Sequence, residues 1–191
     1  MSQVKLLITD FDGTLVDTFE ANFKAYQKAF SENGITLDEE TYRKCFGFRF
    51  DDFMTHMGVT DDAVRQNIRK LKGDYYPQFF DCLRVNQPLL SMLKTFKASG
   101  GMTAVASTAR KKNLMNALEY IRATDAFSLI LAGEDVKHGK PNPEIYQTVL
   151  AHFQVTPDNA LVFEDSEVGV GAANAAGIPY VVINDEFFQK Q

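Results

Sequence analysis

Two aspartates, Asp10 and Asp12, stand two residues apart directly after the short apolar run Leu6–Ile8. Two negative charges about 4 Å apart repel by about 4 kcal/mol at an effective dielectric constant of about 20, so such a pair needs compensation. A hard divalent cation with oxygen ligands supplies that compensation. The pair therefore predicts a metal site at the end of this run.

Further side chains that suit this chemistry follow the later apolar runs. They are Ser107 and Thr108, Lys140, and Glu164 with Asp165. Taken singly, an acidic residue at such a place is usually a helix cap or part of a solvated turn. By the same reasoning Ser107 would cap a helix that begins near Lys111, and Lys140 would be a surface charge.

Together these residues indicate a site for a phosphoryl group. If the runs are adjacent strands, four carboxylates, a hydroxyl and a lysine meet at one place. Mg²⁺ is the predicted cofactor, because it accepts few protein ligands and keeps waters and phosphate oxygens for the rest. Lys140 and Ser107 then suit the oxygens of a phosphoryl group, as a point charge and a hydrogen-bond donor.

Five short apolar runs must position these side chains. Each is rich in β-branched or aromatic residues and too short for a helix, which predicts buried strands. The runs are Lys5–Thr9, Met102–Ser107, Phe127–Leu131, Ala160–Glu164 and Pro179–Ile183. Helical patterns follow at Pro88–Ser99, Lys111–Ile121, Pro143–Phe153 and Glu167–Ala176. This alternation predicts an α/β fold with a doubly wound, Rossmann-like parallel sheet, which binds ligands outside the carboxyl ends of its strands.

The interval from Thr18 to about Cys82 has no convincing strand and reads as helical throughout. Its predicted helices are a stretch from Phe19 that stops at Gly34, then Asp38–Cys45, Phe50–His56, and Asp61–Phe80 with a break near Pro77. An insert of about 65 residues is too long for a βα connection. We therefore expect a small all-helical domain over residues 17–83, inserted after the first strand of a core formed by residues 1–16 and 84–191.

Composition narrows the classes of partner. The formal net charge of -5 and the absence of a basic block argue against nucleic acid. No stretch approaches the ~18 apolar residues of a membrane span, and nothing near Met1 resembles a signal peptide. Cys45 and Cys82 have no paired spacing, which favours reduced thiols and a cytoplasmic protein. The oligomeric state is left open.

Four stretches in order resemble the motifs of the haloacid dehalogenase superfamily, in its phosphatase branch. They are "DFDGTLVDT", "VAST", "GKPNPEIY" and "FEDSEVGVGAANAAGIP". The likeness covers essentially the whole chain, including a helical cap inserted after the first strand. Within the superfamily, the chain resembles proteins of the β-phosphoglucomutase and phosphoglycolate phosphatase type.

The resemblance implies a role for each residue of these motifs. Asp10 is the expected nucleophile that becomes an aspartyl phosphate, and Asp12 the acid/base that protonates the leaving alcohol and then activates water. Ser107 and Lys140 are expected to hold the phosphoryl oxygens. The resemblance places Mg²⁺ on Asp10, on the backbone carbonyl of Asp12 and on Asp165, with Glu164 as a direct or water-mediated ligand.

The resemblance also helps to choose between several possible activities. The dehalogenases that name the superfamily lack the second aspartate and the metal, so Asp12 favours phosphoryl chemistry. A phosphomutase of the β-phosphoglucomutase type is the alternative, but its cap histidine is replaced here by Asn22. Two alternatives from other classes are a receiver-like phospho-switch and a catalytically silent binding module. The intact motifs and the long insert favour a phosphatase.

The substrate is expected to be a small phosphorylated metabolite, such as a sugar phosphate or phosphoglycolate. Candidate substrate contacts in the insert are Gly47 and Arg49 of "CFGFRFDD", together with Asn22 and Lys72, and Thr108 is the candidate in the core. The alternative for the first loop is that its three phenylalanines pack between helices and Arg49 pairs with a neighbouring aspartate. Closure of the cap would exclude water from the reaction.

Overall fold

The computed structural model describes residues 3–188, which divide into two compact units. The chain up to Asp17 and the chain from Arg84 onward form one of them, called the sheet unit below. The other comprises Thr18–Leu83 and is called the helical unit. Each is described by itself.

The sheet unit is built on five parallel strands in the order β5-β4-β1-β6-β7. Their bounds are β1 Leu6–Thr9, β4 Met102–Ala106, β5 Leu129–Leu131, β6 Ala160–Glu164 and β7 Tyr180–Val182. The chain adds β4 and β5 on one side of β1 and then β6 and β7 on the other. The winding therefore reverses between β1 and β6, which is where such a sheet binds ligands. The predicted α/β fold is confirmed, and each of the five apolar runs contains a strand.

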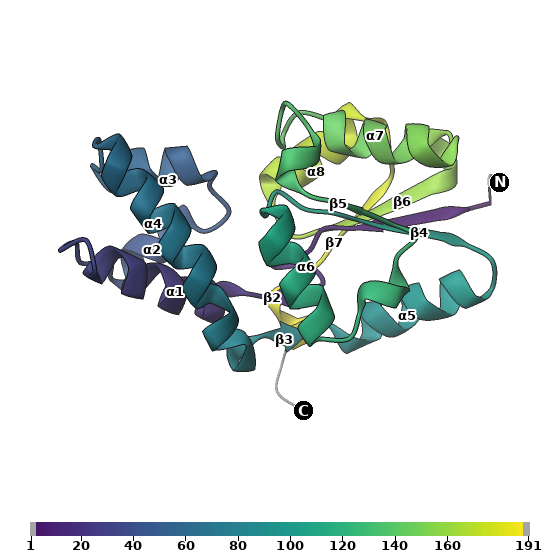
Figure 1. Cartoon of the computed structure of the whole chain (residues 1–191). Helices are drawn as coiled ribbons and strands as arrows, with labels where there is room; N and C mark the ends of the chain where they lie inside the picture. Colours follow the sequence, from purple (N-terminus) through teal and green to yellow (C-terminus); the bar gives the residue numbers. More distant parts are fainter. Residues whose placement is uncertain (1–2, 189–191) are drawn as a thin grey trace. The chain divides into compact units, whose positions relative to one another are not determined.

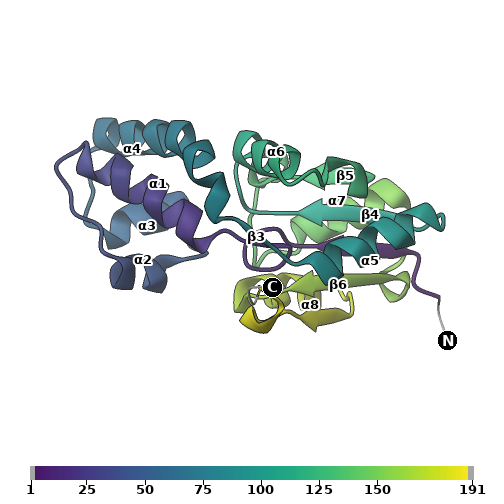
Figure 2. The same ribbon diagram turned by 90° about the horizontal axis from the view of Figure 1, so that it is seen from below.

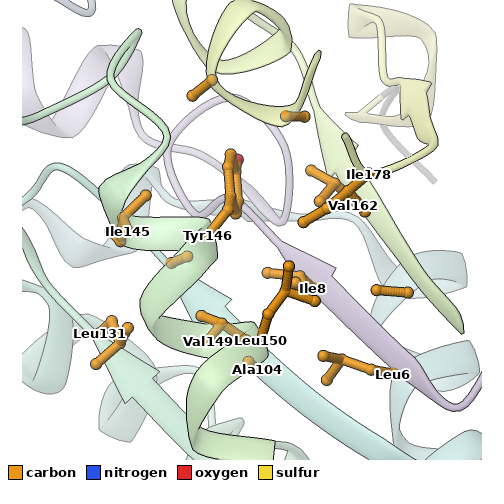
Figure 3. Close-up of a cluster of buried hydrophobic side chains, with 14 residues drawn as sticks. Leu6, Ile8, Ala104, Leu131, Ile145, Tyr146, Val149, Leu150, Val162 and Ile178 are labelled. Carbon is orange, nitrogen blue, oxygen red and sulfur yellow. The ribbon is translucent and has the colours of Figure 1, made fainter. Parts of the chain in front are cut away.

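Helices cover both faces of this sheet (Figures 1 and 2). One face carries α7 (Glu144–Phe153) and α8 (Glu167–Ala175), and the other carries α5 (Gln87–Ala98) and α6 (Lys111–Tyr120). Under α7 and α8, apolar side chains of both layers form a buried cluster (Figure 3). Because strands buried on both faces cannot alternate polar and apolar residues, the sequence shows them as continuous apolar runs.

Two very short strands connect the ends of the sheet unit where the chain leaves it and returns. They are β2 (Val16–Asp17) and β3 (Arg84–Val85), and they pair antiparallel. Asn86 follows β3; it is fully buried, its amide nitrogen donates to the carbonyl of Leu15 at 2.9 Å, and its side chain caps α5. The sequence did not predict this pair, because two residues are too few to show an alternating pattern.

The helical unit contains four α-helices. They are α1 Phe19–Ser31, α2 Glu39–Cys45, α3 Phe50–His56 and α4 Asp62–Tyr75, and a 3₁₀-helix, η1, follows at Tyr76–Cys82. The predicted break near Pro77 is confirmed, since α4 ends two residues before it. Aromatic rings fill the interior, with Tyr42 and Phe30 both within 5.7 Å of Phe53, centroid to centroid. Among the described residues, no helix has both the length and the apolar character to cross a membrane.

Short 3₁₀-helices complete the sheet unit. They are η2 Thr124–Ala126, η3 Gly133–Asp135, η4 Pro157–Asn159 and η5 Asp185–Phe188. Of these, η3 matters most for the site, because it follows β5 beside the end of β4.

Candidate active site

Asp10 is the first residue beyond β1, and its backbone continues the hydrogen bonding of β1 to β6. Its amide nitrogen donates to the carbonyl of Phe163 on β6 at 3.0 Å, and only 7% of the residue is exposed. Burial raises the pKa of the Asp10 carboxyl well above its usual value, although Lys140 opposes this and Glu164 adds to it. The protein therefore keeps a carboxylate at a position where its charge must be balanced by cations.

Lys140 supplies one of these cations from inside the molecule. Its Nζ donates to Asp10 Oδ1 at 2.6 Å and to Glu164 Oε1 at 2.5 Å, and 3% of its side chain is exposed. Burial alone would lower the pKa of Lys140, but the carboxylates of Asp10 and Glu164 raise it well above its usual value. The interpretation of Lys140 as a surface charge is wrong, because the lysine is a buried link between two strand ends.

Glu164, the last residue of β6, is completely buried and accepts hydrogen bonds at both carboxylate oxygens. Oε1 accepts from Lys140 and from the hydroxyl of Tyr146, the latter at 2.7 Å. Oε2 accepts from the backbone of Asp165 at 3.2 Å and from the side chain of Ser166 at 3.2 Å. A Cβ atom on Gly169 would lie 1.9 Å from Glu164 Cδ, so the first turn of α8 needs glycine there.

Asp165 is held over the turn that follows Asp10. Its Oδ1 accepts from the Thr14 hydroxyl at 2.7 Å, and a Cβ on Gly13 would lie 2.1 Å from its Oδ2. Gly13 has φ of +82°, a conformation that side chains other than that of glycine rarely adopt, so both space and backbone require it. Burial raises the pKa of Asp165 to about 6, although the Thr14 hydrogen bond lowers it and Glu164 raises it further.

Ser107 lies directly after β4 and is also fully buried. Its Oγ accepts from the amide nitrogen of Ala109 at 3.0 Å and donates to Asp12 Oδ2 at 3.4 Å. The interpretation of Ser107 as the cap of the next helix is wrong. The first turn of α6 is held instead by Glu134 of η3, whose Oε2 accepts from the amide nitrogen of Lys111 at 2.6 Å.

The donor set suits a hard divalent cation. Asp10, Glu164 and Asp165 each offer a carboxylate oxygen, and these oxygens lie within 4.8 Å of one another. A small cation such as Mg²⁺ takes oxygen ligands of this kind and leaves room for water and phosphate oxygens. Both oxygens of Glu164 already accept hydrogen bonds, so Asp10 and Asp165 are the carboxylates best placed to bind a metal directly. The ligand set, including the Asp12 carbonyl, stays a prediction.

Comparison with known families matches residues 7–183 to the haloacid dehalogenase-like hydrolases. The chain belongs to this family. Among curated proteins it is 30% identical to CbbY of Rhodobacter capsulatus, over 97% of this chain and 87% of that protein. It is 29% identical to the phosphorylated carbohydrates phosphatase of Thermotoga maritima, over 92% of this chain and 82% of that protein.

A solved structure of CbbY from Rhodobacter sphaeroides, in complex with phosphate, matches the fold with a TM-score of 0.84. The two chains are 24% identical, and the match covers 99% of this chain and 90% of the other. The resemblance drawn from the four motifs, a haloacid dehalogenase-like enzyme of the phosphatase branch, is confirmed.

Most of the candidate substrate-binding residues lie in the helical unit, and they differ from one another in exposure and in their partners. Arg49 is exposed, and Gly47 before it has φ of +89°. Asp51, one of the aspartates expected to pair with Arg49, pairs with Arg69 at 3.1 Å instead. Phe48 of the same loop is 51% exposed, so the alternative in which all three of its phenylalanines pack is wrong.

Two of the other candidates, Asn22 and Lys72, are buried, and the third, Thr108, is exposed. Asn22 is 8% exposed on α1, and Lys72 is 9% exposed on α4, where its Nζ lies 4.1 Å from the centroid of the Tyr76 ring. Thr108, in the sheet unit, is exposed beside Ser107. The roles of these residues in substrate binding stay predictions.

Several residues that shape the site were not singled out from the sequence. Tyr146 and Gly169 contact Glu164, and Glu144 accepts from the amide nitrogens of Lys137 and His138, both at 2.8 Å, in the loop before Lys140. Tyr146 and Glu144 lie within "GKPNPEIY", so their place in that motif was a usable signal. Gly169 lies within "FEDSEVGVGAANAAGIP" and so had the same signal, although the reason for a glycine there, the close approach of Glu164, appears only in the fold.

Proposed function

We propose that the protein is a Mg²⁺-dependent phosphatase of small phosphorylated metabolites, which works through an aspartyl phosphate at Asp10. One observation carries the proposal. At the place where the winding of the sheet reverses, Lys140 bridges a buried Asp10 and a buried Glu164. A buried nucleophile with a fixed cation beside it is what attack on an anionic phosphate ester requires.

The reaction assigns one task to each side chain. The Asp10 carboxylate attacks phosphorus and forms an acyl phosphate, while Asp12 gives a proton to the oxygen of the departing alcohol. Asp12 then accepts a proton from water, which attacks the same phosphorus and releases inorganic phosphate with Asp10 restored. The ammonium of Lys140 and the hydroxyl of Ser107 hold the phosphoryl oxygens during both steps.

Asp10 and Asp165, with the backbone carbonyl of Asp12, would hold the cation, and Glu164 would ligate it directly or through water. When bound, Mg²⁺ screens the negative charges of carboxylates and phosphate and so makes an otherwise repulsive encounter possible. The clustered carboxylates, whose burial raises the pKa values of Asp10 and Asp165, support such a role.

The substrate class rests on relatives and on the helical unit. The Thermotoga relative is named for phosphorylated carbohydrates, and a sugar phosphate or a phosphoglycolate-like acid is the class proposed here. The exposed Arg49 suits a second anionic group of such a substrate. Closure of the helical unit over the site would exclude bulk water.

The decisive experiment measures phosphate release from a panel of phosphate esters, including sugar phosphates and phosphoglycolate. Assays with Mg²⁺ and with EDTA are compared, and Asp10→Asn serves as the variant of matched shape. We expect multiple turnover with Mg²⁺, loss of activity in EDTA, and a fall in kcat of about 10³-fold or more for Asp10→Asn.

Four results would overturn the proposal or redirect it. Full activity in EDTA would exclude the metal, and near wild-type turnover by Asp10→Asn would exclude the nucleophile. Formation of glucose 6-phosphate from β-glucose 1-phosphate would identify a mutase. No turnover on any ester, with phosphate bound and retained, would identify a binding or switch module.

A further inference from the structure

Tyr146 of α7 is a fully buried tyrosine whose hydroxyl donates to Glu164, the carboxylate that also accepts from Lys140. It belongs to the apolar cluster beneath α7 and α8, beside Ile145 and Val149 (Figure 3). A phenylalanine would fill the same space, so packing alone does not explain the hydroxyl. Buried tyrosine hydroxyls need a hydrogen-bond partner, and the partner here is Glu164 Oε1 at 2.7 Å.

The hydroxyl of Tyr146 shares its acceptor with Lys140. Glu164 Oε1 accepts from the Tyr146 hydroxyl and from Lys140 Nζ, and the lysine ammonium also lies 5.2 Å from the centroid of the Tyr146 ring. Lys140 Nζ in turn donates to Asp10 Oδ1. A continuous hydrogen-bonded chain therefore runs from the tyrosine hydroxyl through Glu164 and Lys140 to Asp10.

We propose that Tyr146 is a positioning residue that fixes Glu164 and, through it, the ammonium of Lys140. This inference rests on the proposed phosphatase function and adds a residue that acts on the phosphoryl oxygens only indirectly. The far oxygen of Glu164 is fixed by Asp165 and Ser166, so the Tyr146 hydroxyl is what fixes the near one besides Lys140 itself. Without that hydroxyl, Glu164 Oε1 has more charge to share with Lys140 and holds the ammonium away from Asp10 and the phosphate.

The test compares Tyr146→Phe with Ile145→Val, a matched variant on the same helix and in the same buried cluster. Each removes one buried heavy atom, but only the first removes a hydrogen bond to Glu164. We measure kcat and KM on the best ester, the dissociation constant of inorganic phosphate by calorimetry with Mg²⁺, and Tm. For Tyr146→Phe we expect kcat to fall and phosphate binding to weaken, each by about 10-fold, because a hydrogen bond to a charged buried group is lost. For Ile145→Val we expect both within about twofold of wild type.

Three outcomes would decide against the proposal. If Tyr146→Phe keeps wild-type kcat and phosphate affinity, the hydroxyl serves only the fold. If Ile145→Val loses as much as Tyr146→Phe, the effect is general destabilisation, and if kcat falls while phosphate binding is unchanged, Tyr146 does not act through Lys140. A wild-type protein that hydrolyses no ester contradicts the phosphatase function instead, and the calorimetric comparison of the two variants still tests the positioning of Lys140.

Discussion

Two lysines among residues 3–188 are buried, one in each unit, and their surroundings differ. In the sheet unit, Lys140 donates to the carboxylates of Asp10 and Glu164. In the helical unit, the ammonium of Lys72 lies over aromatic rings, 4.1 Å from the centroid of Tyr76 and 5.2 Å from that of Tyr26. Two carboxylates thus balance the charge of Lys140, and the faces of two tyrosine rings stabilise the charge of Lys72.

The carboxylates around Lys140 belong to the candidate active site, whereas the rings around Lys72 belong to the interior of the helical unit. Carboxylates beside Lys140 are reactive groups whose protonation and metal binding can change, whereas the tyrosine rings beside Lys72 have no such chemistry. The ring contacts of Lys72 favour packing for that lysine, although the sequence also left it as a candidate for substrate binding. Burial of a lysine is therefore a weak guide to function until its partners are known.

Replacement of each lysine by methionine gives the largest expected contrast. Lys140→Met removes the cation that we propose holds the phosphoryl group, and we expect kcat/KM to fall by about 10³-fold. Lys72→Met keeps the volume between the rings, and we expect kcat/KM within about threefold and stability within about 1 kcal/mol of wild type. Steady-state kinetics and thermal unfolding of both variants check this, and equal losses of kcat/KM would contradict the distinction.

A second contrast tests how tightly Glu164 is enclosed, using two glycines of α8. A Cβ at Gly169 would lie 1.9 Å from Glu164 Cδ, whereas a Cβ at Gly171 would only touch Pro141 Cβ at 3.4 Å. We expect Gly169→Ala to destabilise the protein by about 3 kcal/mol and to lower activity, because Glu164 must move away from Lys140.

Gly171→Ala is the control, since alanine in a helix interior is favoured over glycine by about 1 kcal/mol. We expect it to be neutral or stabilising and fully active. Urea unfolding and phosphate-release assays measure both variants. Equal behaviour of the two would show that the close approach at Gly169 is not a constraint.

The pattern of the sequence predicted the sheet and the strand-end residues because both depend on local order. The apolar residues Leu6–Ile8, followed by the polar Thr9 and Asp10, are visible in the sequence itself. The sequence could not predict that Lys140 is buried, because its carboxylate partners are 130 and 24 residues away. Contacts at such separations appear only when the strands are in register.

The same reason explains the wrong interpretation of Ser107 as a cap for α6. Local reasoning finds a hydroxyl four residues before the helix, but the group that holds the helix is Glu134, 23 residues further on. Gly133 is required beside it, because a Cβ there would lie 2.5 Å from the carbonyl oxygen of Thr108. Tertiary partners of this kind leave no periodic signal.

The pKa of Asp165 predicts that the free energy of unfolding depends on pH differently with and without a divalent cation. This effect is no larger than those of Lys140→Met and Gly169→Ala. Its folded pKa is about 6 against an ordinary value of 3.8, so the folded state favours the protonated carboxyl. The contribution to the free energy of unfolding is therefore present below about pH 4 and is lost as pH rises through about 6. Without a divalent cation we expect this loss to be about 3 kcal/mol, and Asp165→Asn to abolish it.

Urea unfolding at several pH values between 4 and 8, in EDTA and in saturating Mg²⁺, measures the difference between wild type and Asp165→Asn. Saturating Mg²⁺ should remove or invert the wild-type loss, because the cation stabilises the ionised carboxylate. A difference between wild type and variant that is the same at all pH values, with and without Mg²⁺, would contradict both the shifted pKa and the metal site.

The smallest expected effect belongs to the helical unit and tests whether an exposed arginine selects the substrate. Arg49→Ala should raise KM by about 3-fold to 10-fold with kcat within about twofold and Tm unchanged, because an exposed cation can bind a second anionic group without supporting the fold. Arg43→Ala is the matched control, since Arg43 is also exposed in this unit and pairs with Glu39. The effect on KM should be present for an ester with two anionic groups and absent for one with a single phosphate. If Arg43→Ala raises KM equally, or if both esters respond alike, Arg49 contributes only general charge, and the helical unit recognises the substrate through other residues.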